Sequence, residues 1–325
     1  MNNEIYNIYP IQNKRIFDFY LKARSCFWIE KEIDFSKDHE QWNLLSSDEQ
    51  FFLSNILAFF AQSDQIVNTN LEERFIKDVN SLPKDMIIYT KLFYNFQVMM
   101  EDIHTQTYET MLDTYIKDKK RKQYFQNAIT NIPCIKKKAD WAFKWINDTK
   151  SSFATRLLAF AALEGIFFSG SFCAIFWMKD KNLLEGLTKS NEFIARDEGL
   201  HRDFACELFN QLRTRKDYDF DCNSSIIINV ITEAVQIEKE FITKSFNCNL
   251  IGMNPVLMKQ YIEYIADNLL QMVDEPKYYN STNPFTFIEN IGLENKANFF
   301  ESRSTNYSKS GSYEQNEKIK LDLDF

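Results

Sequence analysis

The sequence predicts an all-α protein, a bundle of long helices, from three observations. Glycine and proline, which most often interrupt regular structure, occur only seven and six times in 325 residues. Apolar residues make up 45 % of the chain, and 30 phenylalanines indicate a large core rich in aromatic rings. Several long stretches repeat apolar residues at helical spacing behind a residue that is suited to begin a helix.

The first predicted helices are marked by their start signals. Ser46 with Glu49 matches a capping box, and an apolar helical pattern follows it. Pro83 opens the next helix, at a first-turn position that tolerates proline, and this helix extends to about Ile116. Residues 117–150 are more polar and basic, so we expect short connecting helices there.

The rest of the chain predicts further helices and a tail. The helices are expected over residues 152–178, 190–212 and 225–246, and from Pro255 through Leu270. Residues 1–45 are mixed in composition, and residues 301–318 are polar with few hydrophobic side chains. We therefore expect a helical domain over residues 1–300 and a mobile tail over residues 301–325.

The segment 157–178 is almost continuously apolar and long enough to span a bilayer. It contains Glu164, however, and a carboxylate in the middle of a lipid-embedded helix is costly. The chain offers no second span of similar quality. A membrane helix is the alternative, and the preferred interpretation is a soluble bundle in which this helix is buried on all sides.

Charge and cysteine content narrow the functional class. A net charge of −8 argues against a nucleic-acid partner, which would need a basic face. The six cysteines form no CxxC element, so zinc-ribbon and redox-motif interpretations fail. The N-terminus has no basic start followed by an apolar run, and we expect a reduced protein in the cytoplasm.

Two of the three histidines occur in the same local motif. His104 follows Glu101 in one Glu-x-x-His, and His201 follows Glu198 in the other, whereas His39 lies in a polar stretch. Residues three apart share one face of a helix, so each pair can present a carboxylate and an imidazole to one point. A single Glu-x-x-His motif usually lies on a solvent-exposed helix face. Its occurrence twice in this chain favours a functional role for both pairs.

Each motif is preceded by a carboxylate in an apolar helix, Asp64 before the first and Glu164 before the second. One acid from each of two helices and Glu-x-x-His from each of two others is the pattern of ferritin-like di-metal proteins. Oxygen and imidazole ligands suit iron or manganese, and the absence of thiolates disfavours zinc and iron–sulfur sites. The fold class is therefore a ferritin-like bundle with additional helices and a di-metal site in its core.

At this point the chain resembles the small subunit of class I ribonucleotide reductase, of the eukaryotic and viral kind. The resemblance covers nearly the whole chain. The segments that carry it are SCFW (25–28), LAFFAQSD (57–64), MEDIH (100–104), KKKADW (136–141), EGIFFSGSF (164–172), RDEGLH (196–201) and LDLDF (321–325).

The resemblance implies an oxidoreductase, the ribonucleoside-diphosphate reductase small subunit, whose two iron ions react with oxygen and leave a stable radical on a tyrosine. The ligands of one iron would be Asp64, Glu101 and His104, those of the other Glu164, Glu198 and His201, with Glu101 and Glu198 bridging. Manganese is not excluded. The radical tyrosine would be Tyr108, one helical turn after His104, although a buried tyrosine is more often a plain core residue.

The resemblance also implies surroundings for this centre. Phe168, Phe172 and Ile194 match the apolar pocket of the radical, although aromatic residues at helical spacing are often plain core. Trp28 and Asp197 match the first relay positions toward the large subunit, with Asp197 accepting a hydrogen bond from a ligand imidazole.

The tail carries the remaining implied functions. Tyr307 matches the relay tyrosine, and nearby Tyr313 is the alternative. The terminal segment resembles the peptide that docks on the large subunit, with apolar anchors at Ile319, Leu321, Leu323 and Phe325. The chain would form a homodimer, or a heterodimer with a small-subunit paralogue, and would supply the oxidising equivalent with which the large subunit makes deoxyribonucleotides for DNA synthesis.

Three other functions compete with this interpretation. An iron-storage protein of the ferritin class would need neither Tyr108 nor a docking tail. A di-iron oxygenase or desaturase would act on its own substrate. A non-catalytic small-subunit paralogue would have lost ligands or the tyrosine, and here all these positions are filled.

Overall fold

The computed structural model describes residues 7–245 and 254–288, and all regular structure in these residues is helical. The chain divides into two compact units, residues 1–284 and 285–325. The long helices of the first unit are α3 (Ser47–Asn70), α5 (Lys84–Tyr115), α11 (Glu185–Thr214), α12 (Ser224–Ser245) and α13 (Pro255–Met272). The shorter ones are α1 (Lys14–Ser25), α2 (Asp38–Trp42), α4 (Ile76–Asp78), α6 (Lys119–Gln126), α7 (Ala128–Asn131), α8 (Pro133–Ile146), α9 (Phe153–Ala162) and α10 (Ser169–Asp180).

Four short helical turns, two of 3₁₀ and two of π type, connect or interrupt these helices. The 3₁₀ turns are η1 (Glu30–Glu32) and η3 (Val79–Ser81), and the π-helical turns are η2 (Leu71–Phe75) and η4 (Leu163–Phe167). Of the second unit, only residues 285–288 are described. The predicted all-helical fold is confirmed, and the predicted tail over residues 301–325 lies outside the described residues.

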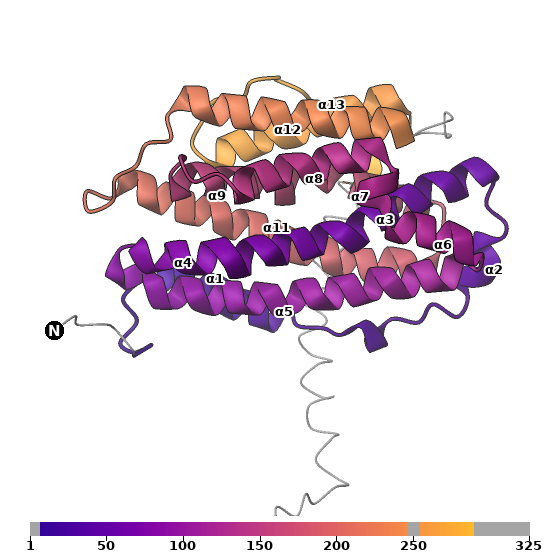
Figure 1. Ribbon diagram of the computed structural model, residues 1–325, viewed down its shortest axis with the longest axis horizontal. Coiled ribbons are helices and arrows are strands. Elements are labelled where there is room, and N and C mark those ends of the chain that lie inside the picture. The colour runs from indigo at the N-terminus through magenta and orange to yellow at the C-terminus, as the bar shows by residue number, and fades with distance from the viewer. Residues whose placement is uncertain (1–6, 246–253, 289–325) are drawn as a thin grey trace, which may run out of the picture. The chain divides into compact units, whose positions relative to one another are not determined.

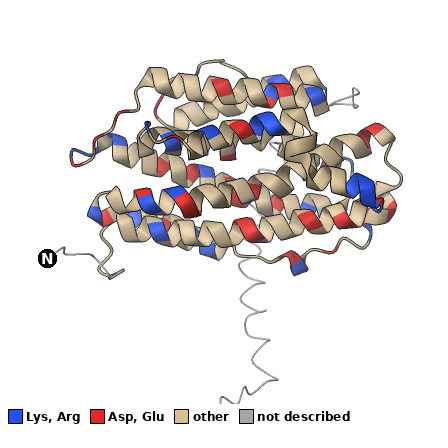
Figure 2. Ribbon diagram, viewed as in Figure 1, with Lys and Arg blue, Asp and Glu red and all other residues tan. Residues whose placement is uncertain are grey.

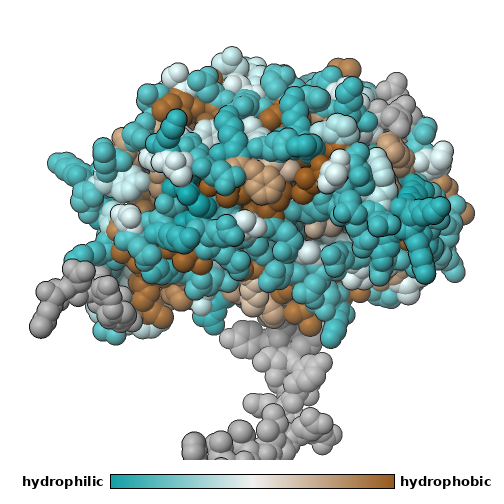
Figure 3. All heavy atoms as spheres, viewed as in Figure 1, coloured by the Kyte–Doolittle hydropathy of each residue, from teal (hydrophilic) through white to brown (hydrophobic). Residues whose placement is uncertain are grey.

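The long helices of the first unit pack lengthwise around a shared core. Helix α3 packs along α5, α9 along α11 and α12 along α13 (Figure 1). Both signs of charge are interspersed along the outward faces of these helices (Figure 2). The visible surface is mostly hydrophilic, apart from a band of apolar residues (Figure 3). Since α3, α5, α9 and α11 meet in the interior, carboxylates on their inner faces lie far from water.

Several helix boundaries follow from local sequence, as predicted. Ser46 caps α3: its Oγ accepts a hydrogen bond from Glu49 N–H at 3.3 Å, and Glu49 Oε2 accepts one from Ser46 N–H at 2.8 Å. Pro83 stands immediately before α5, and Pro255 is the first residue of α13. These signals act within one turn, so the sequence displays them directly.

The structure differs from the prediction at two places along the chain. Residues 1–45, taken as mixed, include helix α1, which Asn13 caps by accepting from Ile16 N–H at 3.2 Å. Helix α11 begins at Glu185, about a turn earlier than predicted, because Asp38 caps it. The Asp38 carboxylate accepts from Gly186 N–H at 2.9 Å and Leu187 N–H at 2.8 Å. A cap that arrives from so far along the chain leaves no local signal.

The apolar segment predicted as one helix consists of α9, η4 and α10, which together span Phe153–Asp180. Among the described residues it is the one helix long and apolar enough to cross a membrane, and its most apolar window is 100 % buried within the protein. It is therefore the core helix of the bundle. The π-helical turn, which the prediction did not include, contains Glu164.

Candidate metal centre and its tyrosine

Four elements bring the six predicted ligand side chains together. Helix α3 supplies Asp64, α5 supplies Glu101 and His104, η4 supplies Glu164, and α11 supplies Glu198 and His201. All six are buried, none more than 3 % exposed. Their ligand atoms form two groups, each within 4.8 Å: Asp64 with Glu101 and His104, and Glu101 with Glu164, Glu198 and His201. Glu101 belongs to both groups, so it lies where a bridging carboxylate would.

The two Glu-x-x-His motifs face each other across the centre. Within each motif the carboxylate lies beside its own imidazole, at 3.3 Å for Glu101 and His104 and 3.1 Å for Glu198 and His201. Across the centre, His104 Nδ1 lies 3.0 Å from Glu198 Oε1, and His201 Nδ1 lies 3.0 Å from Glu101 Oε1. Each glutamate thus touches both imidazoles, and both Nδ1 atoms point into the centre.

Burial, repulsion between carboxylates and attraction between carboxylates and imidazoles shift the pKa values of this centre in different directions. Burial raises the pKa of Asp64 and of Glu164 well above the usual carboxyl value, and neighbouring carboxylates raise both further. Burial opposes the charged form of His201, but Glu101 and Glu198 outweigh it and raise its pKa to about 9. In His104 hydrogen bonds to Asp197 and Glu101 likewise overcome burial and raise the pKa. In the metal-free protein, protons therefore balance the buried negative charge.

The residues present fit a pair of divalent cations. Four carboxylates and two imidazoles, with no thiolate among them, form a ligand set suited to iron or manganese. Both oxygens of Asp64 have no hydrogen-bond partner within the described part of the chain. A buried carboxylate without a donor is costly, and a cation between the two groups would satisfy it.

We expect the affinity of the metal-free protein for Mn²⁺ to rise as the pH rises from 6.5 to 9. Metal ions bind ionised carboxylates and neutral imidazoles, whereas the raised pKa values of Asp64, Glu164 and the histidines favour the protonated forms. Binding must therefore release protons. Calorimetry in buffers of different ionisation enthalpy measures their number, and Glu164→Gln should release fewer. Affinity that does not change over this pH range would contradict the expectation.

Tyr108 lies on α5 one turn beyond His104 and is 0 % exposed. Its hydroxyl donates a hydrogen bond to Asn191 Oδ1 of α11 at 3.2 Å. Phe60 of α3 stacks on its ring, with centroids 4.7 Å apart and planes 5° apart. Burial raises the pKa of Tyr108 well above its usual value, and the charge of Asp64 is the next cause. The phenol is therefore dry, neutral and close to the carboxylate centre.

Two of the three residues predicted for an apolar pocket pack on Phe60, the ring that covers Tyr108. Phe168 and Phe172 both pack on Phe60, at centroid distances of 5.5 and 4.9 Å, and so form the wall behind the ring that covers Tyr108. Ile194 is 1 % exposed and lies one turn after Asn191 on α11. Side chains of this kind have no proton to exchange with a phenol.

Asp197 lies between Trp28 and His104, the arrangement implied by the resemblance. Its Oδ2 accepts a hydrogen bond from Trp28 Nε1 at 2.7 Å and lies 3.3 Å from His104 Nε2. The indole of Trp28 also stacks near the imidazole, with centroids 5.9 Å apart. Arg196 fixes the other oxygen of Asp197 at 3.1 Å and donates to the carbonyl oxygen of Cys26 at 2.5 Å. The segment carrying Trp28 is thereby tied to α11.

Four residues of the site were missing from the sequence prediction: Phe60, Gln97, Asn191 and Arg196. Gln97 donates to Glu101 Oε1 at 3.3 Å and to Glu164 Oε1 at 3.1 Å, so it orients carboxylates from two elements. A signal was available, because Phe60 and Gln97 each precede a ligand by four residues, one helical turn. His39, despite its polar stretch, is half-buried, with its Nδ1 3.1 Å from the carbonyl oxygen of Thr114.

The predicted tail residues lie outside the described residues. They are Tyr307, Tyr313, Ile319, Leu321, Leu323 and Phe325.

Comparison with known proteins gives a consistent set of relatives. The family described as ribonucleotide reductase, small chain, matches residues 5–284. The ribonucleoside-diphosphate reductase small chain of Neurospora crassa is 51 % identical over 324 residues, which cover 99 % of this chain and 76 % of that protein. The protein of the same name from Vaccinia virus (strain Copenhagen) is 49 % identical over 319 residues, which cover 98 % of this chain and 96 % of that protein.

Solved structures agree with these sequence matches. The ribonucleotide reductase Rnr4 homodimer from Saccharomyces cerevisiae matches with a TM-score of 0.77 at 37 % identity, covering 94 % of this chain and 91 % of that chain. The ribonucleotide reductase R2 subunit from Clostridium botulinum matches with a TM-score of 0.76 at 21 % identity, covering 89 % of this chain and 91 % of that chain. At this lower identity the likeness shows the fold alone.

Proposed function

The chain belongs to the ribonucleotide reductase small-chain family, and from this premise we propose that it generates a stable radical on Tyr108 and passes it to a large subunit. It is the small subunit of a ribonucleoside-diphosphate reductase, an oxidoreductase that works with a large subunit. The observation that carries the proposal is the burial of Tyr108 beside two facing Glu-x-x-His motifs and two further carboxylates.

Two iron ions are the proposed occupants of the centre, with manganese as the alternative. One would be held by Asp64, Glu101 and His104, the other by Glu164, Glu198 and His201, with Glu101 and Glu198 shared. When bound, the metal pair supplies the ability to use molecular oxygen as an oxidant. The side chains of the protein contribute orientation, charge and exclusion of water.

Tyr108 is the proposed residue that loses an electron and its phenolic proton. Its hydrogen bond to Asn191 holds the hydroxyl in one direction, and Phe60 covers its face. Phe168, Phe172 and Ile194 keep water and reductants from the ring, since none of them carries a group that would quench a radical. Burial of this kind is what a long-lived phenoxyl radical requires.

Trp28 and Asp197 are proposed to start the transfer toward the large subunit. If Trp28 is oxidised, its indole N–H becomes acidic, and Asp197 already accepts a hydrogen bond from that proton. Asp197 also lies against His104 Nε2, so the carboxylate connects the ligand imidazole to the indole. Tyr307 is the proposed next carrier, in the tail, with Tyr313 as the alternative.

We further propose the partners and location. The segment 319–325 would dock on the large subunit through Ile319, Leu321, Leu323 and Phe325, and the small subunit would form a homodimer or a heterodimer with a paralogue. A cytoplasmic location is supported by the five described cysteines, all of which are free.

Metal analysis combined with electron paramagnetic resonance tests the central proposal. The full-length protein, loaded with iron(II) and exposed to oxygen, is expected to bind two iron ions and to show a tyrosyl-radical signal. Absence of bound metal would overturn the metal centre. Two bound ions without a radical would overturn the role of Tyr108 and leave the metal centre standing.

Removing residues 319–325 is expected to abolish turnover with the large subunit while iron content and the radical signal stay at wild-type levels. The reason is that the docking anchors are lost and the metal centre, in the first unit, is untouched. A titration of activity against added large subunit measures the effect. Turnover equal to that of the full-length chain would contradict the docking role.

A further inference from the structure

The helix that carries Glu164 changes its hydrogen-bonding pattern at η4 (Leu163–Phe167). A π-helical turn contains one residue more than an α-helical turn, so the side chains that follow it are rotated by about 100° relative to a continuous α-helix. Glu164 lies inside this turn, whereas Phe168 and Phe172 follow it. The direction of the ligand relative to the wall of the Tyr108 pocket therefore depends on this turn.

Side chains satisfy the backbone where the π-helical turn ends. The carbonyl oxygen of Ile166 accepts a hydrogen bond from Ser169 Oγ at 2.7 Å, and the carboxylate of Glu238 on α12 lies against Gly170. An added Cβ at Gly170 would lie 2.6 Å from Glu238 Oε1, so glycine is what admits the carboxylate to the backbone.

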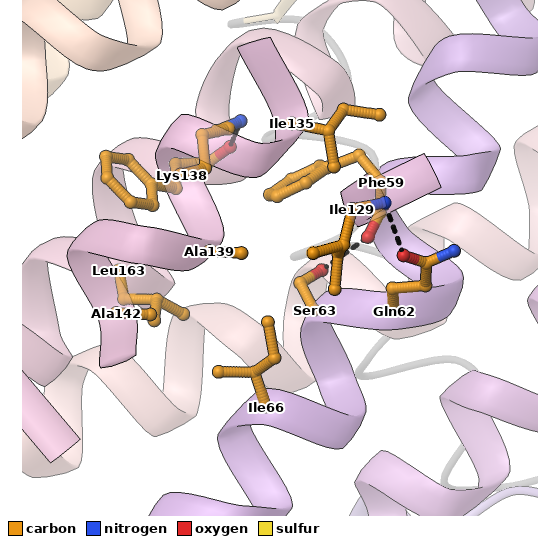
Figure 4. A pocket seen from close by; sticks show the side chains of 11 residues that line it. Phe59, Gln62, Ser63, Ile66, Ile129, Ile135, Lys138, Ala139, Ala142 and Leu163 are labelled. Atoms are coloured by element: carbon orange, nitrogen blue, oxygen red, sulfur yellow. Dashed lines mark hydrogen bonds between the residues drawn. The ribbon is translucent and has the colours of Figure 1, made fainter. Parts of the chain in front are cut away.

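Lys138 of α8 contacts the last residue of the same π-helical turn. Its Nζ donates to the carbonyl oxygen of Phe167 at 2.7 Å and lies 2.5 Å from Glu238 Oε2. The ammonium also lies over the rings of Phe59 and Phe241, 3.5 and 3.9 Å from their centroids. Figure 4 shows Lys138 and Phe59 among the residues from α3, α7, α8 and η4 that line one groove.

The Lys138–Glu238 ion pair is a poor source of stability. The two side chains are 1 % and 0 % exposed, and removing both charges from water carries a cost that their attraction seldom exceeds. Replacing such a pair with apolar residues is often neutral or stabilising. What apolar residues would not reproduce is the hydrogen bond from Lys138 to the carbonyl oxygen of Phe167, where Glu238 holds the ammonium and lies against Gly170.

We propose that Lys138 and Glu238 are positioning residues that clamp η4 in its π-helical form and so aim Glu164 at the metal centre. The inference rests on the proposed function, because the geometry matters through the metal ions that Glu164 would hold. The clamp acts through the backbone, and neither residue touches the ligand atoms that form the centre.

Paired substitutions on the full-length protein separate this role from stability. The test variant combines Lys138→Met with Glu238→Leu, which removes the clamp and keeps apolar volume. The matched control combines Lys137→Met with Glu240→Leu, an ion pair between the same two helices whose side chains are 50 % and 42 % exposed. A second test variant, Gly170→Ala, keeps both charges and displaces the carboxylate, and Gly199→Ala, whose Cβ would meet nothing within 4 Å, is its control.

Two measurements are made on each protein: hydrogen exchange of the amides of residues 163–171, without metal, and the affinity for Mn²⁺. In both test variants we expect exchange in this segment to become about tenfold faster or more, and Mn²⁺ to bind about 10–100-fold more weakly. The melting temperature of the double variant should be equal to or above that of wild type. Both controls should match wild type in exchange and affinity.

Wild-type exchange and affinity in the test variants would overturn the clamp. If the double variant fails to fold, the Gly170→Ala variant, which retains the ion pair, decides by the same criteria. If the wild-type protein binds no Mn²⁺, the proposed metal centre fails, and the exchange measurement still decides whether the ion pair holds η4. The two failures are therefore distinguishable.

Discussion

Replacing Tyr108 with phenylalanine is expected to eliminate the tyrosyl-radical signal and reduce turnover to the background of the assay, while both metal ions stay bound. The substitution removes one oxygen atom, the one that donates to Asn191, and leaves the ring stacked on Phe60. Losing this hydrogen bond leaves Asn191 Oδ1 without its donor and costs about 1–3 kcal/mol, which a bundle of this size tolerates. The metal ligands are untouched, so metal content should not change.

Tyr94→Phe is the matched control for this experiment. Tyr94 lies on the same helix, α5, is 0 % exposed, and its hydroxyl has no hydrogen-bond partner among the described residues. Its substitution should leave the radical signal and turnover at wild-type levels. A radical signal that persists in Tyr108→Phe and disappears in Tyr94→Phe would reassign the radical site.

Replacing Asp197 with asparagine is expected to reduce turnover by about 10–100-fold while the radical on Tyr108 still forms. The amide keeps the size of the carboxylate but loses its charge, so it no longer accepts a proton from Trp28 Nε1, 2.7 Å away. Its hydrogen bond to His104 also weakens, which should slow metal loading without preventing it. Stopped-flow absorbance follows radical formation, and steady-state assays with the large subunit follow transfer.

Asp203→Asn serves as the control because the local geometry is the same. Asp203 lies on α11 and is held by the preceding residue, Arg202, at 2.6 Å, as Asp197 is held by Arg196. It contacts neither an indole nor a ligand imidazole in the described structure. Turnover should therefore be unchanged. Loss of the radical in Asp197→Asn would mean that the residue supports the metal centre alone, and unchanged turnover would exclude it from the relay.

The parts of the fold that the sequence predicts are those governed by neighbours in the chain. Ser46, Pro83 and Pro255 act on backbone groups within one turn, and the apolar spacing of each long helix repeats within it. The start of α11 escaped prediction because its cap, Asp38, belongs to a different helix. The π-helical turn at Glu164 escaped for the same reason, since Lys138, which bonds to its last carbonyl oxygen, and Glu238, which pairs with Lys138, come from α8 and α12.

The residues of the site can be divided in the same way, into those that the sequence indicates and those that only tertiary packing brings to the site. Asp64, Glu164 and the Glu-x-x-His pairs could be identified because their residue types and spacing are unusual for buried helices. Asn191 could not, because an amide on a helix is common and only the packing of α5 on α11 brings Asn191 to Tyr108. Phe60 is one phenylalanine among 30, and its contact with Tyr108 depends on how α3 lies against α5.

The extended segment around Trp28 lies between the candidate metal centre and the protein surface. Trp28 is 2 % exposed, whereas its neighbours Phe27 and Ile29 are 51 % and 36 % exposed. The indole thus lies beside His104, while the residues before and after it in the chain reach the surface. If the proposed function holds, transfer between His104 and the surface passes through one side chain and needs no opening motion. The protein surface that covers the segment around Trp28 would then determine when each electron passes.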